Sequence, residues 1–445
     1  MTENDKLAIL GGPKVRSKPW PNWPDLREED LKPAIEAIST GNVGADAFNY
    51  TTTFEEKFAE YCGVKYGITA NSGTSACHMA VAATQVGPGD EVIVPCHTFY
   101  ASAAAICQNG ARPVFADIDP KTLCIDPEDI RKKITPRTKA IMPVHIWGQP
   151  CEMDPIMELA EKHSLYVIED CAQAHGVEYK GKKVGGIGHI SAFSMISGKI
   201  MCTGYEGGMV VTDDPEMAVL ARRIGDLGYA YEIMNERLEG RPLMKSENGM
   251  SLYLTGSHVR LHDRIGWNYR LTEFQSAIGL KQFERLETDN LNVRRRNGLM
   301  LNEHLKDVKE INIPVEPDHV KHGYWWYPIT LNIEYLNCNR LEFIFALQDE
   351  GIVCGAGETA TLYDEPVFQK LTGFGRSGFP FECEWCPPDS PLHKGKWSYE
   401  NVVCKNGEAL DKRLLIISIQ PTCGEEEMND IVTAVKKVCK AYSKL

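Results

Sequence analysis

Residues 139–170, KAIMPVHIWGQPCEMDPIMELAEKHSLYVIED, decide the fold, because they hold two strand patterns separated by one helix pattern. The runs at 139–144 and 165–170 are short and apolar, which is typical of buried strands, and residues 153–163 have helical spacing. A strand, a helix and a second strand in this order predict a crossover connection that makes the two strands parallel. The segment therefore predicts an α/β protein.

The same alternation runs from about residue 54 to residue 215. Helical spacing recurs at 72–84 and 127–134, between further apolar runs that are bounded by Gly, Pro, Asn or Asp. Those runs lie at 66–70, 91–95, 113–118, 190–195 and 208–213. Because apolar strands alternate with helices, we expect a mainly parallel seven-stranded sheet covered on both faces, with functional groups at the carboxyl ends of its strands.

The rest of the chain is less regular. A polar, glycine-containing stretch at 228–262 is interpreted as an inserted loop, and a helical segment follows at 272–291. In the C-terminal third, fewer and mixed elements predict a smaller α+β domain that includes a strand at 413–419 and a terminal helix at 425–445. Within it, residues 373–409 are rich in Pro, Gly, Trp and Cys, which predicts a long surface excursion.

Length and composition limit the possible classes of protein. The 445 residues suffice for two or three domains of about 100–200 residues, and we predict a large domain at 1–295 and a small one at 296–445. The net charge of −13 disfavours nucleic acid and anionic lipid as partners. Neither a signal-peptide pattern nor a run of about 18 apolar residues is visible, so we expect no membrane span. The 15 cysteines are scattered singly, which is typical of reduced thiols in a cytoplasmic protein.

Three motifs carry the chemistry. The first, Asn71-Ser72-Gly73-Thr74-Ser75-Ala76, follows a strand and opens a helix, where free backbone N–H groups can hold a phosphate. The alternative is that Ser72 is only a helix N-cap. The second, residues 169–176 (EDCAQAHG), places Asp170 at the carboxyl end of a strand, where it could hold a protonated ring nitrogen. The alternatives there are an N-cap or a metal ligand.

The third motif, residues 194–208 (SMISGKIMCTGYEGG), places Lys199 just past an apolar strand. A lysine in an apolar pocket loses part of its proton affinity and becomes a usable nucleophile. The alternative is an ordinary solvated lysine. A phosphate cradle, a carboxylate and a nucleophilic lysine at successive strand ends are together the requirements of pyridoxal phosphate (PLP).

These motifs, with EVIVPCHTFYAS at 91–102 and GWNYRLTEFQSAIG at 266–279, resemble the DegT/DnrJ/EryC1/StrS family of sugar and aminocyclitol aminotransferases. The resemblance covers about residues 20–288, with a weaker tail from 300 to 445. WPNWP at 20–24 and the Gly198-Lys199 pair look closest to the branch that holds scyllo-inosose-type transaminases and 3-amino-5-hydroxybenzoate synthases. The resemblance to the family implies the fold-type-I architecture of PLP-dependent transferases, with a three-layer α/β/α large domain.

The resemblance also implies the role of each matching residue. Lys199 would form the internal aldimine and then act as the base, and Asp170 would pair with the pyridinium nitrogen. Gln173 would lie near the ring's phenolic oxygen, and Phe99 would stack on the ring. The phosphate would be held by Gly73, Thr74 and Ser194, and by Asn268 from the second subunit of a homodimer with shared sites.

Substrate residues are less defined by the sequence. His145 and His175 lie on the active-site side, although a lone histidine there is as often structural. The aromatic run that begins at Tyr324 could line a sugar or cyclitol site or simply pack as a strand. Residues Cys383, Cys386, His393 and Cys404 could form a zinc site, but free loop thiols are the favoured interpretation and we predict no metal.

The expected activity is a ping-pong transfer of an amino group from glutamine or glutamate to a keto-cyclitol of the inosose type or to a keto-sugar. An aromatising enzyme like 3-amino-5-hydroxybenzoate synthase and a nucleotide-sugar aminotransferase are alternatives within the family. A PLP sugar dehydratase is disfavoured because Lys199 stands where that relative has histidine. A silent binding protein is disfavoured because Lys199, Asp170, Gln173 and Ser194 are all present.

Overall fold

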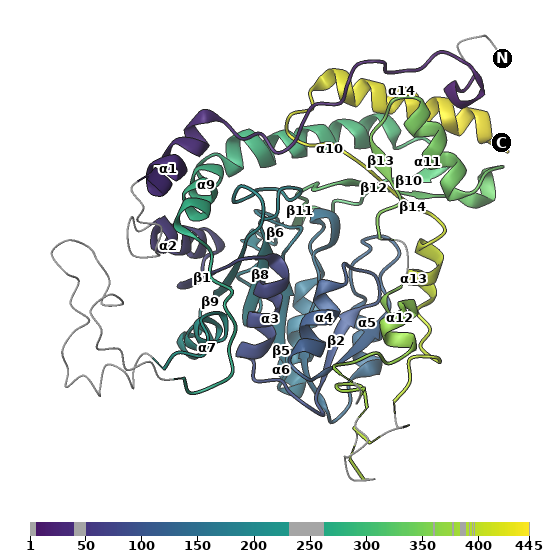
Figure 1. The fold of residues 1–445 in the computed structure, drawn as a ribbon. Helices are drawn as coiled ribbons and strands as arrows, with labels where there is room; N and C mark the ends of the chain where they lie inside the picture. Colours follow the sequence, from purple (N-terminus) through teal and green to yellow (C-terminus); the bar gives the residue numbers. More distant parts are fainter. Residues whose placement is uncertain are drawn as a thin grey trace.

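The computed structural model describes residues 6–39, 50–230, 262–358, 361–375, 378–382, 389, 390, 392, 393, 395 and 397–444. Its largest element is a seven-stranded sheet with the order β1-β9-β8-β5-β4-β2-β3 (Figure 1). The strands are β1 Tyr66–Ala70, β2 Glu91–Pro95, β3 Arg112–Ala116, β4 Thr138–Ile141, β5 Tyr166–Asp170, β8 Ile190–Ser194 and β9 Gly208–Thr212. Each strand overlaps the run predicted for it, which confirms the seven-stranded sheet.

Only β9 departs from the parallel direction. It runs antiparallel to both of its neighbours, β1 and β8, whereas the other neighbouring strands are parallel. The parallel strands are joined by crossover helices, which include α4 Ala101–Gln108, α5 Pro127–Lys133 and α6 Met153–His163. Because β8 and β9 are antiparallel, a loop at 195–207 is enough to connect them, and this loop carries Lys199.

Helices cover both faces of the sheet, as the apolar strands predict. Alternate side chains of a strand point to opposite faces, and β9 shows this directly. Val210 lies in an apolar cluster with α3 Gly73–Ala83 and α7 Pro215–Gly225. Met209 and Val211 lie in another, with α2 Tyr50–Cys62 and α9 Glu273–Glu284. The large domain therefore has three layers, α/β/α.

The small domain is built on a four-stranded antiparallel sheet with the order β10-β12-β14-β13. Its elements are β10 Ile311–Asn312, β12 Tyr327–Leu331, β13 Cys354–Gly355, β14 Leu414–Ile417, α10 Asn292–Leu305, α11 Arg340–Asp349 and α14 Glu425–Tyr442. A small sheet, β11 Val320–Lys321, β6 Glu178–Tyr179 and β7 Lys182–Lys183, connects it to the large domain. The predicted strand at 413–419 and terminal helix are confirmed.

The N-terminal segment packs against the small domain, although it lies next to the large domain in sequence. Leu7, from the N-terminal segment assigned to the large domain, is buried in the small domain's core. Arg16 follows it and forms ion pairs of 2.8 Å with Glu427 and Asp430 on α14. The predicted boundary between residues 295 and 296 stays a prediction.

The described part of the predicted excursion at 373–409 differs from a surface loop. Phe381, Tyr399 and Cys404 are buried in the large domain's core, and the Phe381 and Tyr399 rings pack around Phe368. Residues 231–261, which form most of the predicted inserted loop at 228–262, lie outside the described residues. No helix in the described ranges has the length and apolar character needed to cross a bilayer.

Candidate active site

The predicted site residues gather at the carboxyl ends of β1, β5 and β8. Asp170 is the last residue of β5, and Ser194 is the last residue of the adjacent strand β8. Gly73 begins α3 directly after β1. Three sequence segments that lie far apart in the chain therefore meet at one edge of the sheet.

The helix start of α3 is pressed against the end of β8. A Cβ atom added at Gly73 would lie 2.4 Å from the Ser194 Cβ, so only glycine fits there. Ser72 caps the helix, since its hydroxyl accepts a hydrogen bond from the Ser75 N–H at 3.1 Å. This confirms the N-cap alternative for Ser72 and leaves Thr74 exposed beside the positive end of the helix. Such a helix terminus next to a serine hydroxyl is a suitable phosphate cradle.

Asp170 is a buried carboxylate held by neutral hydrogen-bond donors. Its Oδ2 accepts hydrogen bonds from the Ser102 hydroxyl at 2.7 Å and from the Cys77 thiol at 3.8 Å. Its Oδ1 accepts the Ala172 N–H at 3.0 Å. Among the described residues, no lysine, arginine or histidine forms an ion pair with it. A buried carboxylate needs a compensating charge, and a protonated ring nitrogen would supply it.

Gln173 is buried and held in one orientation. Its Oε1 accepts the backbone N–H of Trp147 at 2.7 Å. Its Nε2 has no partner in the described part of the chain, which leaves both of its hydrogens available, one of them to an oxygen on a bound ring.

Lys199 is held by two tryptophans from distant segments. The indole of Trp23 donates to the Lys199 carbonyl at 3.1 Å, and the indole of Trp325 donates to the Gly198 carbonyl at 2.8 Å. The Lys199 Nζ lies 3.8 Å from the centre of the Trp325 ring. Burial lowers the pKa of Lys199 to about 8, against smaller opposing effects of the Asp170 and Glu358 carboxylates. The lysine is therefore a usable nucleophile close to neutral pH.

Phe99 and Asn268 lie at exposed positions on the same side. Phe99, between β2 and α4, is 54% exposed, so its ring is accessible to stack on a ligand. Asn268 is also exposed, and its carbonyl accepts a hydrogen bond of 3.4 Å from the side chain of Asn71. Its side chain is available to a second subunit.

The two histidines differ from each other. His145 is buried, with its Nδ1 accepting the Cys151 N–H at 3.0 Å and its Nε2 facing Glu169 at 3.1 Å. Both ring nitrogens are engaged, which favours the structural alternative for His145. His175 is buried among aromatic rings, and neither of its nitrogens has a partner among the described residues. Burial, with Lys199 and Arg294 nearby, lowers the pKa of His175 to about 3, so it is neutral.

Tyr324 lies in the core and not in the site. It is 0% exposed, its hydroxyl donates to Glu316 at 2.7 Å, and the same hydroxyl accepts from Asn302 at 3.0 Å. Its neighbour Trp325 reaches the lysine instead and stacks on Trp147 at 5.6 Å between ring centres. The aromatic run at 324–327 therefore does contribute a residue to the site. The sequence could not show which one, because Tyr324 has a positive φ of 47° that breaks the alternation of side chains expected of a strand.

Sequence reasoning also missed Ser102 and Glu358. Ser102 lies in the first turn of α4 and is the shortest contact of Asp170. Glu358 follows Gly357, which has a φ of 69° and packs beside the Trp147 ring. Burial raises the pKa of Glu358 above its usual value, and Lys199 opposes that rise. Ser102 is the last residue of the motif at 91–102, but its role could not be deduced from that motif, and no motif includes Glu358.

The predicted zinc alternative is only partly within the described residues, because Cys383 and Cys386 are not among them. Cys404 lies close to Cys96 and Asp117, with ligand atoms within 4.8 Å of one another. The Asp117 oxygens are already used, since they accept N–H bonds of 3.0 Å each from the first turn of α13, Lys405–Leu410. The cysteines in the described ranges are unbridged.

Comparison with known proteins identifies the family of the chain. Residues 24–388 match the DegT/DnrJ/EryC1/StrS aminotransferase family. The chain is 40% identical over 307 residues to a GDP-perosamine synthase of Caulobacter vibrioides, covering 68% of this chain and 74% of that one. It is 39% identical over 309 residues to an L-glutamine:2-deoxy-scyllo-inosose aminotransferase of Streptomyces lividus, covering 68% of each.

A solved structure of an aminotransferase from Psychrobacter cryohalolentis superposes with a TM-score of 0.81 at 31% identity, covering 95% of this chain and 100% of that one. The residues present also fit PLP, because the Gly73–Ser194 cradle, the buried Asp170 carboxylate and the partly buried Lys199 suit its phosphate, ring nitrogen and aldehyde. The chain belongs to the DegT/DnrJ/EryC1/StrS family of PLP-dependent sugar and aminocyclitol aminotransferases.

Proposed function

We propose that this protein transfers an amino group from glutamine or glutamate to a keto-cyclitol of the inosose type, with a keto-sugar as the alternative acceptor. The observation that carries the proposal is the partly buried Lys199, with its lowered pKa, near the sheet edge that also holds Asp170, whose carboxylate forms no ion pair within the described part of the chain. The similarity to glutamine-dependent inosose aminotransferases supports the cyclitol acceptor. The equally strong similarity to a GDP-perosamine synthase supports the keto-sugar.

The proposed cofactor site uses residues from five segments. Gly73, Thr74 and Ser194 hold the phosphate, Phe99 covers one face of the ring, Gln173 donates to the ring oxygen and Asp170 holds the ring nitrogen. Asn268 completes the phosphate site of a second copy, so the functional unit is a homodimer. We also propose a cytoplasmic location, which suits unbridged cysteines.

When bound, PLP supplies an electron sink that makes the donor's α-hydrogen acidic. The chain's own groups do the rest. Lys199, with its lowered pKa, accepts a proton at Nζ as a general base and returns it as a general acid in the second half of the cycle. The Asp170 carboxylate would accept the N–H of the ring nitrogen and so favour the protonated form of that nitrogen. The Trp325 ring covers one side of the Lys199 amine, with Nζ 3.8 Å from the ring centre, and limits its contact with water.

Glu358 supports an acceptor rich in hydroxyl groups. Its partly buried carboxylate is close enough to Lys199 for each group to influence the pKa of the other, and it lies on the side formed by the small domain. Carboxylate oxygens accept hydrogen bonds from hydroxyls, and a cyclitol or sugar ring presents several of these. Glu358 is therefore our candidate for binding the acceptor.

A half-reaction assay tests the proposed function. The PLP-loaded enzyme is mixed with glutamine, glutamate or alanine, and loss of the cofactor's characteristic absorbance reports which donor reacts. The aminated enzyme is then offered scyllo-inosose, 2-deoxy-scyllo-inosose and a panel of nucleotide-linked keto-sugars. We expect glutamine or glutamate to react and an inosose to restore the absorbance. Recovery with keto-sugars alone would reassign the acceptor, and no reaction with any amino donor would refute the transaminase proposal.

A further inference from the structure

Three consecutive backbone carbonyls around Lys199 each accept a hydrogen bond from a side chain that is distant in sequence. The carbonyls are those of Gly198, Lys199 and Ile200, and their donors are the side chains of Trp325, Trp23 and Asn290, in that order. The Lys199 N–H is also used, since it donates to the Ile196 carbonyl at 2.9 Å. The backbone that carries the lysine is therefore fixed from several sides.

The three donors meet at one residue, Arg294 of α10. Its Nε donates to the Asn290 Oδ1 at 2.7 Å, and its Nη1 donates to the Trp325 carbonyl at 2.8 Å. Its guanidinium lies over the ring of Trp23, with 5.1 Å from the guanidinium carbon to the ring centre. Asn290 belongs to the π-helical segment Leu286–Leu291 directly before α10, four residues before the arginine, so the two side chains are neighbours on one face. One side chain therefore contacts every donor to the 198–200 backbone.

Arg294 is a buried cation. It is 2% exposed, and in the described part of the chain no carboxylate forms an ion pair with it. Burial lowers its pKa to about 9, so the guanidinium stays charged at neutral pH. A buried charge is costly unless electron-rich groups surround it, and here these are a carbonyl, an amide oxygen and an aromatic ring. Such contacts in several directions use the planar fork of an arginine, which lysine lacks.

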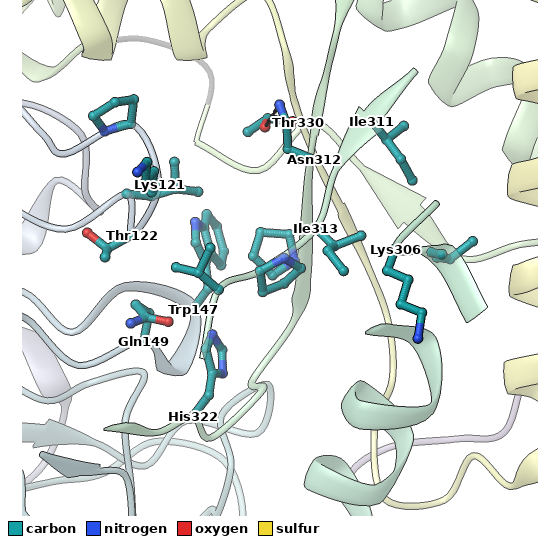
Figure 2. A pocket seen from close by; sticks show the side chains of 16 residues that line it. Lys121, Thr122, Trp147, Gln149, Lys306, Ile311, Asn312, Ile313, His322 and Thr330 are labelled. Atoms are coloured by element: carbon teal, nitrogen blue, oxygen red, sulfur yellow. Dashed lines mark hydrogen bonds between the residues drawn. The ribbon is translucent and has the colours of Figure 1, made fainter. Parts of the chain in front are cut away.

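Trp325 links Arg294 to the lysine amine. Its backbone N–H donates to the Trp147 carbonyl at 3.1 Å, and its ring stacks on that of Trp147. Trp147 in turn forms part of the wall of a cavity of about 440 Å³ between the large and small domains (Figure 2). Since the Lys199 Nζ lies 3.8 Å from the centre of the Trp325 ring, the position of this tryptophan decides how well the amine is shielded from water.

We propose that Arg294 is a positioning residue for Lys199. Through its three partners it fixes the backbone of residues 198–200 and keeps the lysine amine against the Trp325 ring. This inference rests on the proposed role of Lys199 as the residue that carries the cofactor. When Arg294 is replaced, the segment relaxes, and the amine leaves the ring and becomes more hydrated. Because water favours the ammonium form, the pKa of Lys199 then rises.

Competitive acetylation of the full-length, cofactor-free protein measures this effect. Trace acetic anhydride acetylates neutral amines only, so mass spectrometry of the Lys199 peptide over a pH series gives the midpoint of its titration. We expect a midpoint near pH 8 in wild type. Arg294→Met should raise it by about one pH unit or more, toward the value of about 10.4 for a lysine in water. The titratable groups that face the amine stay unchanged: Asp170 of β5, Cys77 of α3, His175 and Glu358.

Two further variants separate positioning from other effects. Asn290→Leu keeps the charge of Arg294 and removes the bond to the Ile200 carbonyl, so it should raise the midpoint in the same direction. Arg112→Met is the matched control, because Arg112 is also buried, lies over a tryptophan ring and donates to a backbone carbonyl, but on the edge strand β3. It should lower the free energy of unfolding as Arg294→Met does and leave the Lys199 midpoint unchanged.

Either of two results would overturn the proposal. One is the same midpoint in Arg294→Met and in wild type. The other is a midpoint that rises in Arg294→Met but not in Asn290→Leu, which would mean that Arg294 acts on the amine only through its charge.

A third variant covers the case in which Arg294→Met fails to fold. Trp23→Phe keeps an aromatic ring but removes the donor to the Lys199 carbonyl. An unchanged midpoint in both Trp23→Phe and Asn290→Leu would then overturn the proposal. Because acetylation needs no cofactor, a failure of the cofactor assignment, seen as borohydride labelling of another lysine, is detected separately.

Discussion

At Lys199 the surroundings of one side chain create the proposed chemistry. A lysine in water is almost fully protonated at neutral pH, since its pKa is about 10.4. Here burial against Trp325 disfavours the ammonium form, while Asp170 and Glu358 keep the loss of proton affinity moderate. The outcome is a group that can both take and give a proton near neutral pH.

This lowered pKa predicts a pH dependence for cofactor attachment. Only the neutral amine attacks an aldehyde, so attachment of PLP to Lys199 in the cofactor-free protein should be slow in acid and rise with pH. The rate should level off above about pH 8, where the amine is already neutral. The measurement is a pH series of attachment, stopped with borohydride and quantified by mass spectrometry. A rise that continues to about pH 10.4 would contradict the burial effect.

Asp170→Asn tests the charge on the ring nitrogen. The amide keeps the shape of the side chain but cannot hold a proton on that nitrogen, so the rate of the donor half-reaction should fall about 10³-fold. Ser102→Ala is the control, because it removes one hydrogen bond to the carboxylate and keeps the charge. Its rate should fall only about tenfold. An Asp170→Asn enzyme within tenfold of wild type would refute the role of Asp170.

At the scale of elements, the contact between α3 and β8 matters most. The start of the helix and the end of the strand approach so closely that Gly73 has no room for a Cβ beside Ser194. This closeness brings free helix N–H groups and a serine hydroxyl to one point. The cradle therefore depends on element packing as much as on the residues that line it.

Gly73→Ala should therefore weaken PLP binding at least tenfold and lower the free energy of unfolding by about 1–3 kcal/mol, since the added methyl forces the two elements apart. Gly87→Ala is a matched control, because nothing lies within 4 Å of a Cβ at that position. It should leave both quantities nearly unchanged. Equilibrium dialysis with PLP and urea unfolding measure the two effects. Equal behaviour of the two variants would contradict the close-packed cradle.

The elements also show how far the sequence could be interpreted. The seven strands and α6 were predictable, because apolar runs and helical spacing are local properties of the chain. The positions of Asp170 and Lys199 followed from where strands end. Trp325, Ser102 and Glu358 could not be found this way, since each reaches the site through contacts with segments distant in sequence. For Tyr324 the structure favours the alternative of packing in the core, because its positive φ breaks the strand alternation.

At the scale of the whole molecule, the cores do not follow chain order. Leu7 at one end of the chain packs with α14 at the other, and Phe381 from the C-terminal third is buried against the large domain. Composition and periodicity carry no information on such long-range contacts. The domain boundary predicted between residues 295 and 296 therefore rested only on the change in secondary-structure pattern along the chain. The two domains are interlocked by these exchanged segments.

The proposed homodimer gives a prediction at this scale. Asn268 is exposed and reaches beyond its own chain in the proposed arrangement. Asn268→Ala should therefore remain dimeric but lose PLP several-fold faster on dialysis than wild type. Sedimentation velocity combined with cofactor absorbance measures both properties. A wild-type protein that is monomeric and retains PLP would rule out sites shared between subunits.

Borohydride reduction of the PLP-loaded protein, followed by peptide mass mapping, is the most direct test of the central claim. We expect a pyridoxyl group on the peptide that contains Lys199, one per chain, and none in Lys199→Ala. A label on any other lysine, or equal labelling of the Lys199→Ala protein, would contradict the assignment of Lys199 as the residue that carries the cofactor.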